Sequence, residues 1–527
     1  MNSAIELSVA CDRRGEPFKH FWNFCVGAGR ANEGLRADWQ EQLKLAVEQC
    51  GFKYVRFHGL FHDDMFVYRE VNGSGVCNWQ YVDALFDAML DIGVRPFVEL
   101  GFCPGPLASQ LKTVFWWGGH GSPPKDYSKW AELVGNFVRH CLSRYGLEEV
   151  RKWYFEVWNE PNLHPFFTGT KSQYFELYKT SAKVIKQISP ELRVGGPATS
   201  NFVPDERFDG EAEDVSRQIT HQTENLDSLS WKGVWIEDFL AYCVKENLPL
   251  DFLSTHPYPT DFALDGHGRT TGRTRGVNST RDDLTWLRNI IDRSAYPDAE
   301  IHLTEWSSSP SSRDYSHDYL PAGAFVLKTN LDSRRLVDSL SYWVFTDVFE
   351  EGGAGNTIFH GGFGLINFQG IVKPTFHAYR FLNSLGDEEL AAADGAFVSR
   401  DSITGRIAVA AYNYPSEMPQ VVPMAINDRE KAEAIMNTGS DKRLHLTLTG
   451  LRPGSKFMLE RIDGNHGFAL AAWKKMGMPE PPDRIQTALL RQAAFNTGST
   501  EFTVGHDGTF EYNTVLKPWS FILIKEE

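Results

Sequence analysis

Two glutamates, Glu160 and Glu305, stand where apolar stretches of the sequence end. Asn159 and Glu160 follow the run FEVW and precede Pro161, which cannot continue a β-ladder and so ends the strand. Glu305 ends the run IHLT and precedes a serine-rich loop. A carboxylate at the end of a buried strand is unfavourable unless it is paired or used, so two such placements indicate a functional pair more than two separate structural ion pairs.

A pair of facing carboxylates fits the cleavage of a glycosidic bond. One carboxyl group protonates the departing oxygen, while the other attacks the anomeric carbon or activates water. Polar residues at other strand ends can bond sugar hydroxyls, and aromatic rings can cover the apolar faces of a sugar. The polar candidates are Arg56, His58, Asn159, His256 and Tyr258, and the aromatic ones are Phe115, Trp116, Trp117, Trp306 and Trp343, for each of which core packing is the competing interpretation.

Other chemistries find less support in the sequence. His58, His62, Asp63 and Asp64 have the spacing of no dedicated metal site, and glycosidic cleavage needs none, so we expect neither a metal nor another cofactor. Gly27 and Gly29 lack the third glycine of a dinucleotide-binding fingerprint. Gly352, Gly353 and Gly355 lack the Lys-Ser/Thr of a phosphate-binding loop.

Short apolar runs alternate with amphipathic helical stretches eight times between about residues 19 and 386. Regular alternation indicates a parallel sheet, and eight repeats favour closure into a (β/α)8 TIM-type barrel, an α/β fold. In such a barrel the ends of the strands meet at one mouth, which brings the candidate residues together. The predicted strands are 20–27, 54–61, 94–102, 153–160, 193–199, 251–258, 300–307 and 339–347, and the predicted helices are 39–50, 78–93, 126–145, 171–188, 234–247, 281–293, 322–336 and 374–385.

The pattern changes after residue 387 to strands separated by turn-rich segments, with no convincing long helix. Strands such as GRIAVAAYNY, KRLHLTLTG and WSFILIK are typical of a β-sandwich. The N-terminal segment IELSVACD also alternates like a strand and lies before the barrel. We therefore expect a catalytic barrel over residues 15–386 and an accessory β-sandwich made of residues 1–14 and 387–527.

Composition narrows the possible partners and the cellular setting. The net charge of -15 and the absence of a basic block argue against nucleic-acid binding. Seven scattered cysteines with no C-x-x-C pair are typical of reduced, packed thiols. The N-terminus has no signal-peptide pattern and no run approaches a membrane span, so we expect a cytoplasmic protein with no membrane partner.

The chain resembles glycoside hydrolase family 39, within the large clan of retaining glycosidases whose strands end in Asn-Glu-Pro and in Glu. The clan pattern is carried by WYFEVWNEPN at 153–162 and HLTEW at 302–306. The family pattern is carried by YVRFHGLFHDDM at 54–65, FWWGG at 115–119, PPKDYSKW at 123–130, STHPYP at 254–259 and YWVFTDVFEE at 342–351. After Glu305 the chain reads Trp-Ser-Ser-Ser-Pro, a departure from the family's common Phe-Asn-Thr-Ser-Tyr.

This resemblance implies a retaining, exo-acting β-D-xylosidase that releases xylose from xylo-oligosaccharides. It implies Glu160 as acid/base and Glu305 as nucleophile, and it implies sugar-binding roles for His58, Asn159, His256, Tyr258, Trp343 and Glu350. Because a nucleophilic Glu305 should stay ionised, we also expect Arg56 to be its partner behind the site. Within the family the alternative is an α-L-iduronidase-like activity, which requires a cationic clamp for the sugar carboxylate. From another class, the alternative is a non-catalytic carbohydrate-binding barrel, against which the presence of both glutamates argues.

Overall fold

A computed structural model of the chain describes residues 4–219, 225–260, 274–417 and 428–527. Eight parallel strands close into a barrel, as predicted, and each predicted run overlaps one of them. In chain order these strands are β3 (Cys25–Arg30), β4 (Tyr54–His58), β7 (Arg95–Leu100), β10 (Tyr154–Val157), β11 (Arg193–Ser200), β14 (Phe252–His256), β15 (Glu300–Trp306) and β16 (Ser339–Tyr342).

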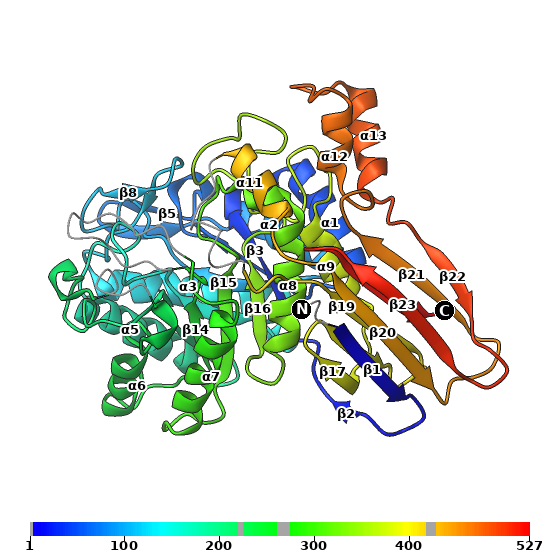
Figure 1. The fold of residues 1–527 in the computed structure, drawn as a ribbon. Helices are drawn as coiled ribbons and strands as arrows, with labels where there is room; N and C mark the ends of the chain where they lie inside the picture. Colours follow the sequence, from blue (N-terminus) through cyan, green and yellow to red (C-terminus); the bar gives the residue numbers. More distant parts are fainter. Residues whose placement is uncertain (1–3, 220–224, 261–273, 418–427) are drawn as a thin grey trace.

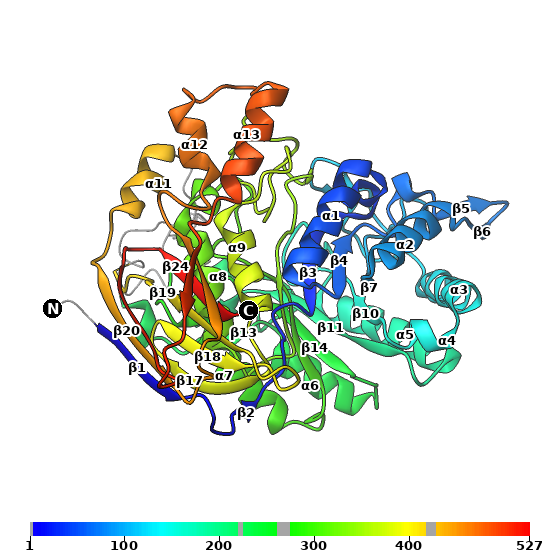
Figure 2. The ribbon, with the colours of Figure 1, turned by 90° about the vertical axis from the view of Figure 1, so that its right-hand side faces the viewer.

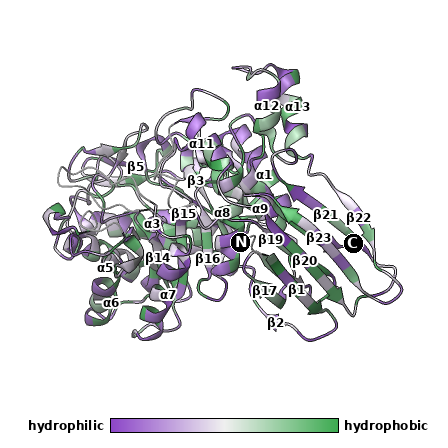
Figure 3. Ribbon diagram, in the orientation of Figure 1, coloured by the Kyte–Doolittle hydropathy of each residue, from purple (hydrophilic) through white to green (hydrophobic). Residues whose placement is uncertain are grey.

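Helices surround this barrel, and Figures 1 and 2 show them outside the strands. Figure 3 shows hydrophilic and hydrophobic residues mixed along outer helices such as α6 and α7, as expected where one face packs on the barrel and the other meets water. The helices around the barrel are α1 (Ala37–Cys50), α2 (Gln80–Ile92), α3 (Tyr127–Tyr145), α5 (Lys171–Ile188), α6 (Ile236–Lys245), α7 (Ser279–Asp292), α8 (Leu320–Asp332) and α9 (Pro374–Asn383), with the short α4 (Leu147–Val150) after α3.

Local signals in the sequence explain where several helices begin and end. The Asp126 side chain accepts bonds from the first backbone N–H groups of α3, and Thr170 forms a capping box with Gln173 at the start of α5. Helices α1 and α2 end at Gly51 and Gly93, whose φ angles of 75° and 100° lie in the left-handed region that suits glycine.

The barrel interior is layered because side chains on a strand alternate in direction with a period of two. The lower layer is aromatic and contains Tyr54, Phe97, Tyr154 and Phe252. Two residues further along three of these strands, a fully buried layer of charged groups lies toward the carboxyl ends of the strands, and it consists of Arg56, Glu99 and Glu156.

Two sheets form the sandwich beside the barrel, and their facing sides share an apolar core with residues such as Val9, Val409, Leu446 and Ile524. The small sheet has the order β1 (Ala4–Ala10), β20 (Lys442–Thr449), β23 (Phe510–Leu516). The large sheet has the order β2 (Glu16–Pro17), β17 (Glu388–Ala393), β18 (Ala396–Arg400), β19 (Ile407–Tyr412), β24 (Phe521–Glu526), β21 (Lys456–Ile462), β22 (Thr500–Thr503).

The C-terminal part also contains helices that the sequence interpretation omitted. These are α11 (Arg429–Met436), α12 (Ala469–Lys475) and α13 (Arg484–Ala494), and the last begins with a capping box between Asp483 and Gln486. Figure 1 shows α12 and α13 standing together above the strands, as an insertion between β21 and β22. None of the helices in the described ranges is both long enough and apolar enough to cross a membrane.

Candidate active site

A pocket of about 210 Å³ opens at the carboxyl ends of the barrel strands, above the charged layer. It brings together most of the residues predicted for the site, including both glutamates. Its lining consists of His58, Phe115, Asn159, Glu160, Leu163, Phe166, Ser200, Tyr258, Glu305, Pro310, Trp343, Glu351 and Phe363.

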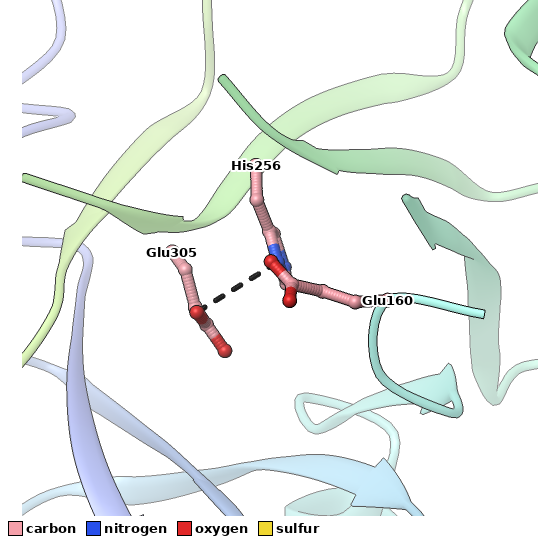
Figure 4. A group of neighbouring side chains, drawn as sticks. All are labelled: Glu160, His256 and Glu305. Carbon is pink, nitrogen blue, oxygen red and sulfur yellow. Dashed lines mark hydrogen bonds and ion pairs between the residues drawn. The ribbon is translucent and has the colours of Figure 1, made fainter. Parts of the chain in front are cut away.

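Glu160 follows the carboxyl end of β10 and Glu305 lies near the carboxyl end of β15, and Figure 4 shows them on either side of His256. One oxygen of each carboxyl group and a ring nitrogen of His256 lie within 4.8 Å of one another. Glu160 is presented by a turn in which it and Trp158 have φ angles of 42° and 73°. Non-glycine residues in this region carry strain that is typical of functional sites. Both carboxyl groups are buried, with residue exposures of 6% and 5%.

Arg56 lies beneath the pocket and links four acceptors. Its guanidinium donates to Glu305 Oε1 at 2.6 Å, to Glu156 Oε2 at 2.7 Å and to Asn159 Oδ1 at 2.9 Å. Its Nη2 also lies 3.1 Å from Glu99 Oε2. The partnership with Glu305 that the sequence suggested is therefore direct. Burial alone would lower the pKa of Arg56, but the surrounding carboxylates raise it, so the cation is permanent.

Glu305 also accepts a bond from the Tyr258 hydroxyl at 3.1 Å. Burial raises the pKa of Glu305, and the positive charge of Arg56 opposes that rise. The short contact with a permanent cation and the phenol bond both stabilise the carboxylate form. These contacts favour the carboxylate, which is the form of Glu305 that can act as a nucleophile.

His58 stands on the pocket wall between carboxylates. Its Nδ1 lies 2.6 Å from Glu99 Oε2, and its Nε2 lies 3.4 Å from Glu351 and 3.5 Å from Glu305. Burial alone would lower the pKa of His58, but Glu99 and Glu351 outweigh it and raise the pKa to about 10. The ring is thus a cation at neutral pH.

Glu160 sits in a different environment from Glu305, because no cation bonds to it directly. Burial raises its pKa to about 7, so the group gains and loses a proton near neutral pH. Its Oε1 lies 3.0 Å from Nδ1 of His256. Burial lowers the pKa of His256 to about 4, so that ring is neutral.

Two of the predicted sugar-binding residues lie elsewhere. Glu350 turns away from the pocket and pairs with Arg30 at 2.8 Å and Arg36 at 3.1 Å, while the next residue, Glu351, lines the pocket. The two adjacent glutamates point to different sides, so Glu351 and not Glu350 is on the pocket wall. His256 lies beneath the lining with both ring nitrogens bonded to protein groups, Glu160 and Thr304.

The aromatic candidates divide in the same way. Phe115 and Trp343 line the pocket. Trp306 is fully buried and packs against Phe325 and Tyr342. Trp116 is 70% exposed on the loop beside the pocket, where its backbone N–H bonds to the carbonyl of Glu351. Trp306 is therefore a core residue, which was the alternative to sugar contact.

Sequence reasoning missed Glu99, Glu156, Ser200 and Glu351. The first two carried a readable signal, because each is a lone acid inside an apolar strand, in RPFVEL and YFEV. A buried carboxylate is stabilised by a cation beside it, and Arg56 on β4 is that cation for both residues.

Glu160, His256 and Glu305 are also close enough to hold a metal ion. A His ligand offers a metal one free ring nitrogen. Here Nδ1 faces Glu160 at 3.0 Å and Nε2 faces Thr304 at 2.9 Å, so the imidazole is already used on both sides. The arrangement fits two cooperating carboxyl groups better than a metal centre.

A TIM-type barrel with two neighbouring carboxyl groups at its mouth, one bonded to a guanidinium and one with its pKa raised to about 7, has the arrangement expected of a glycoside hydrolase. A family model described as glycosyl hydrolases family 39 matches residues 5–510. The chain belongs to this family.

Relatives of known activity and structure agree with this assignment. A β-xylosidase from Caldicellulosiruptor saccharolyticus is 36% identical over 531 residues, which cover 99% of this chain and 98% of that protein. An α-L-iduronidase from Canis lupus familiaris is 32% identical over 203 residues, 36% of this chain and 29% of that protein. The crystal structure of a family 39 enzyme from Xanthomonas axonopodis pv. citri has a TM-score of 0.85 at 32% identity, covering 100% of this chain and 98% of that one.

Proposed function

We propose that the protein is a retaining β-D-xylosidase that removes single xylose units from the non-reducing ends of xylo-oligosaccharides. The observation that carries this proposal is the pairing of Glu160 with Glu305, whose oxygens lie within 4.8 Å across a small pocket. Retaining glycosidases keep their carboxyl groups about 5–5.5 Å apart, whereas inverting enzymes need a wider gap for water.

In the proposed mechanism Glu305 attacks the anomeric carbon while Glu160 gives its proton to the departing oxygen. This forms a covalent glycosyl-enzyme and leaves Glu160 ionised. Glu160 then takes a proton from the water that displaces the sugar from Glu305. Arg56 and Tyr258 hold the oxygens of Glu305 before the attack. The residues proposed to bind the sugar are His58, Phe115, Asn159, Tyr258, Trp343 and Glu351.

The charges of the pocket support a neutral sugar rather than a uronic acid. Its described lining has three carboxyl groups, Glu160, Glu305 and Glu351, and neither lysine nor arginine. The charge of His58 is already matched by Glu99 and Glu351. A sugar carboxylate would face this acidic lining without a cationic clamp, which favours xylosidase over iduronidase action.

The size of the pocket supports removal of one sugar at a time. Its volume of about 210 Å³ is below the 300–1,000 Å³ typical of sites for drug-sized ligands. A cleft that binds the middle of a polysaccharide would have to accommodate several sugar rings. We further propose that catalysis belongs to residues 15–386, and that residues 1–14 and 387–527 form an accessory unit, to whose large sheet β2 (Glu16–Pro17) adds an edge strand.

The test is hydrolysis of a panel of aryl glycosides by the purified protein, with the anomer of the first-formed sugar followed by NMR. We expect the aryl β-D-xyloside to be the best or nearly the best substrate and to release β-xylose first. Glu305→Gln is the matched control, which should lose nearly all turnover while still binding xylose. Preference for an aryl α-L-iduronide, or release of α-xylose first, would contradict the proposal.

A further inference from the structure

A chain of four buried side chains connects the charged layer to Glu160. Glu156 Oε1 lies 2.7 Å from the Thr304 hydroxyl, and that hydroxyl lies 2.9 Å from Nε2 of His256. The other ring nitrogen of His256, Nδ1, lies 3.0 Å from Glu160 Oε1. Every member is at most 6% exposed, so water does not compete for these bonds.

The direction of each bond follows from the charge at the lower end of the chain. Arg56 donates to Glu156 at 2.7 Å. Burial is the largest single influence and raises the pKa of Glu156, but Arg56 and the other neighbouring groups together lower it below its usual value. An ionised carboxylate has no proton to donate, so the Thr304 hydroxyl donates to Glu156. The hydroxyl has one proton, and therefore it accepts from Nε2–H of His256.

The upper end of the chain is then fixed as well. A neutral imidazole has one N–H, and here it lies on Nε2, so Nδ1 offers only a lone pair. Glu160 can bond to that lone pair only by donating its own O–H. We infer that Glu156 and Thr304 are positioning residues that fix the tautomer of His256 and thereby hold Glu160 in the protonated form needed for the first chemical step.

This inference rests on the proposed function, because it explains why the free enzyme presents an acid. During the reaction only the proton of Glu160 moves: it passes to the departing oxygen, and a proton from water replaces it. His256 keeps its Nε2 proton throughout, and Thr304 keeps its own. The chain is thus a fixed set of dipoles and not a path for proton transfer.

Other groups at the strand ends also act on Glu160, and the Ser200 hydroxyl at the end of β11 favours its ionised form by a hydrogen bond. Arg56 and His58 on β4 favour its ionised form, and Glu99 on β7 favours its protonated form. Further carboxyl and phenol groups face it from the ends of β14, β15 and β16, namely Tyr258, Glu305 and Glu351. All of these groups remain when the Thr304 hydroxyl is removed. That single change therefore isolates the effect of the hydrogen bonds from Glu156 through Thr304 and His256 on Glu160.

The first experiment compares Thr304→Val with Thr304→Ser in the pH profile of kcat/KM for an aryl β-D-xyloside. Glu160 must be protonated in the free enzyme, so kcat/KM falls as the pH rises through its pKa. Without the hydroxyl the ring can carry its proton on Nδ1 and donate to ionised Glu160. The basic limb should then move to lower pH by about one unit, and serine should restore its position.

Thr255→Val is the matched control, because Thr255 is a buried hydroxyl on the same strand as His256 whose bond goes to the carbonyl of Thr199 at 2.8 Å. It should leave the basic limb in place. The inference would be overturned if the basic limb of kcat/KM stayed at the same pH in Thr304→Val. It would also be overturned if Thr304→Ser or Thr255→Val moved the limb by the same amount, since altered packing would then be the cause.

The second experiment reads the tautomer in the unaltered protein and needs no activity. Ring-nitrogen NMR shifts of histidine-labelled protein distinguish Nε2–H from Nδ1–H, and His256→Asn identifies the signals. We expect the Nε2–H form, and an Nδ1–H form would refute the inference even if xyloside hydrolysis were strong. Failure of the unaltered protein to hydrolyse any β-xyloside would instead refute the proposed function.

Discussion

Two carboxyl groups of the same residue type acquire different roles from their neighbours. Glu305 has a guanidinium nitrogen at 2.6 Å and a phenol at 3.1 Å, which favour the anion. Glu160 has a neutral imidazole at 3.0 Å, and burial raises its pKa to about 7. Environments that separate the ionisation of two acids assign the acid and the nucleophile without any change in residue type.

Removal of Glu160 should affect poor leaving groups most. Glu160→Ala should slow xylobiose hydrolysis by about a hundredfold to ten-thousandfold, because the departing sugar hydroxyl needs a proton. Formation of the glycosyl-enzyme from a dinitrophenyl xyloside should slow far less. Azide needs no base and should restore turnover of that substrate as β-xylosyl azide. Equal slowing of both substrates with no azide product would assign Glu160 to binding or structure.

The adjacent glutamates after β16 provide a matched pair of variants. Glu351 lines the pocket and contacts His58, whereas Glu350 pairs with two arginines outside it. Glu351→Gln should lower kcat/KM for the aryl xyloside by about tenfold to a hundredfold, the cost of losing a charged hydrogen bond. Glu350→Gln should change it by less than about threefold. The reverse order would restore Glu350 as the sugar-binding residue.

The candidate residues were readable from the sequence where they end apolar runs, as Glu160 and Glu305 do. The difference between Glu350 and Glu351 was not, because both follow the strand and only the loop conformation decides which one faces the pocket. The role of His256 was equally hidden, since its partner Thr304 lies on another strand.

At the scale of elements, the barrel strands place one aromatic layer and one charged layer beneath the site. Every second residue of β4 points into the barrel. Tyr54 therefore lies in the aromatic layer, Arg56 in the charged layer and His58 on the pocket wall. The strands could be predicted because buried parallel strands are short apolar runs bounded by helices. The helices α12 and α13 could not, because they are short insertions within a run of strands.

A buried ion cluster fixes the loops that follow β15 and β16. Lys373 lies 2.7 Å from both Asp318 and Asp347 and donates to the carbonyl of Gly362 at 2.9 Å. The next residue, Phe363, lines the pocket. This cluster therefore couples the shape of the pocket to the stability of the loops.

Lys373→Met should destabilise the protein by about 3–5 kcal/mol, because it leaves two buried carboxylates without their cation. Urea unfolding followed by fluorescence measures this loss. Lys517→Met is the control, since that lysine is 70% exposed and pairs with Asp441 at the surface. Its cost should be at most about 1 kcal/mol. Equal costs for the two variants would show that the Lys373 cluster contributes nothing beyond a surface pair.

At the scale of the whole molecule, the barrel and the sandwich share apolar packing. Sandwich residues such as Phe397, Tyr412 and Phe521 belong to the same buried cluster as the barrel residues Phe325 and Leu331. Figure 2 shows the sandwich strands against the barrel helices α8 and α9. An interface this apolar resembles a continuous core more than a hinge between independent units.

A shared core should make the chain unfold as one cooperative unit. Phe457 tests this, because it is fully buried in the core between the two sandwich sheets, where it stacks on Phe510 with ring centroids 5.0 Å apart. Phe457→Ala should cost about 3–5 kcal/mol. Since Phe457 lies outside the barrel, any effect on the active site must pass through cooperativity between the two parts.

Calorimetry with parallel assays of residual xyloside hydrolysis measures that coupling. We expect one transition in the unaltered protein and one in Phe457→Ala, with the Tm lowered and with activity lost over the same interval, because loss of the sandwich removes the packing that covers α8 and α9. Two transitions, with activity surviving the first and lost at the temperature of the unaltered protein, would mean that the barrel folds alone. The sandwich would then be an appendage, and the division at residue 386 would separate two independent domains.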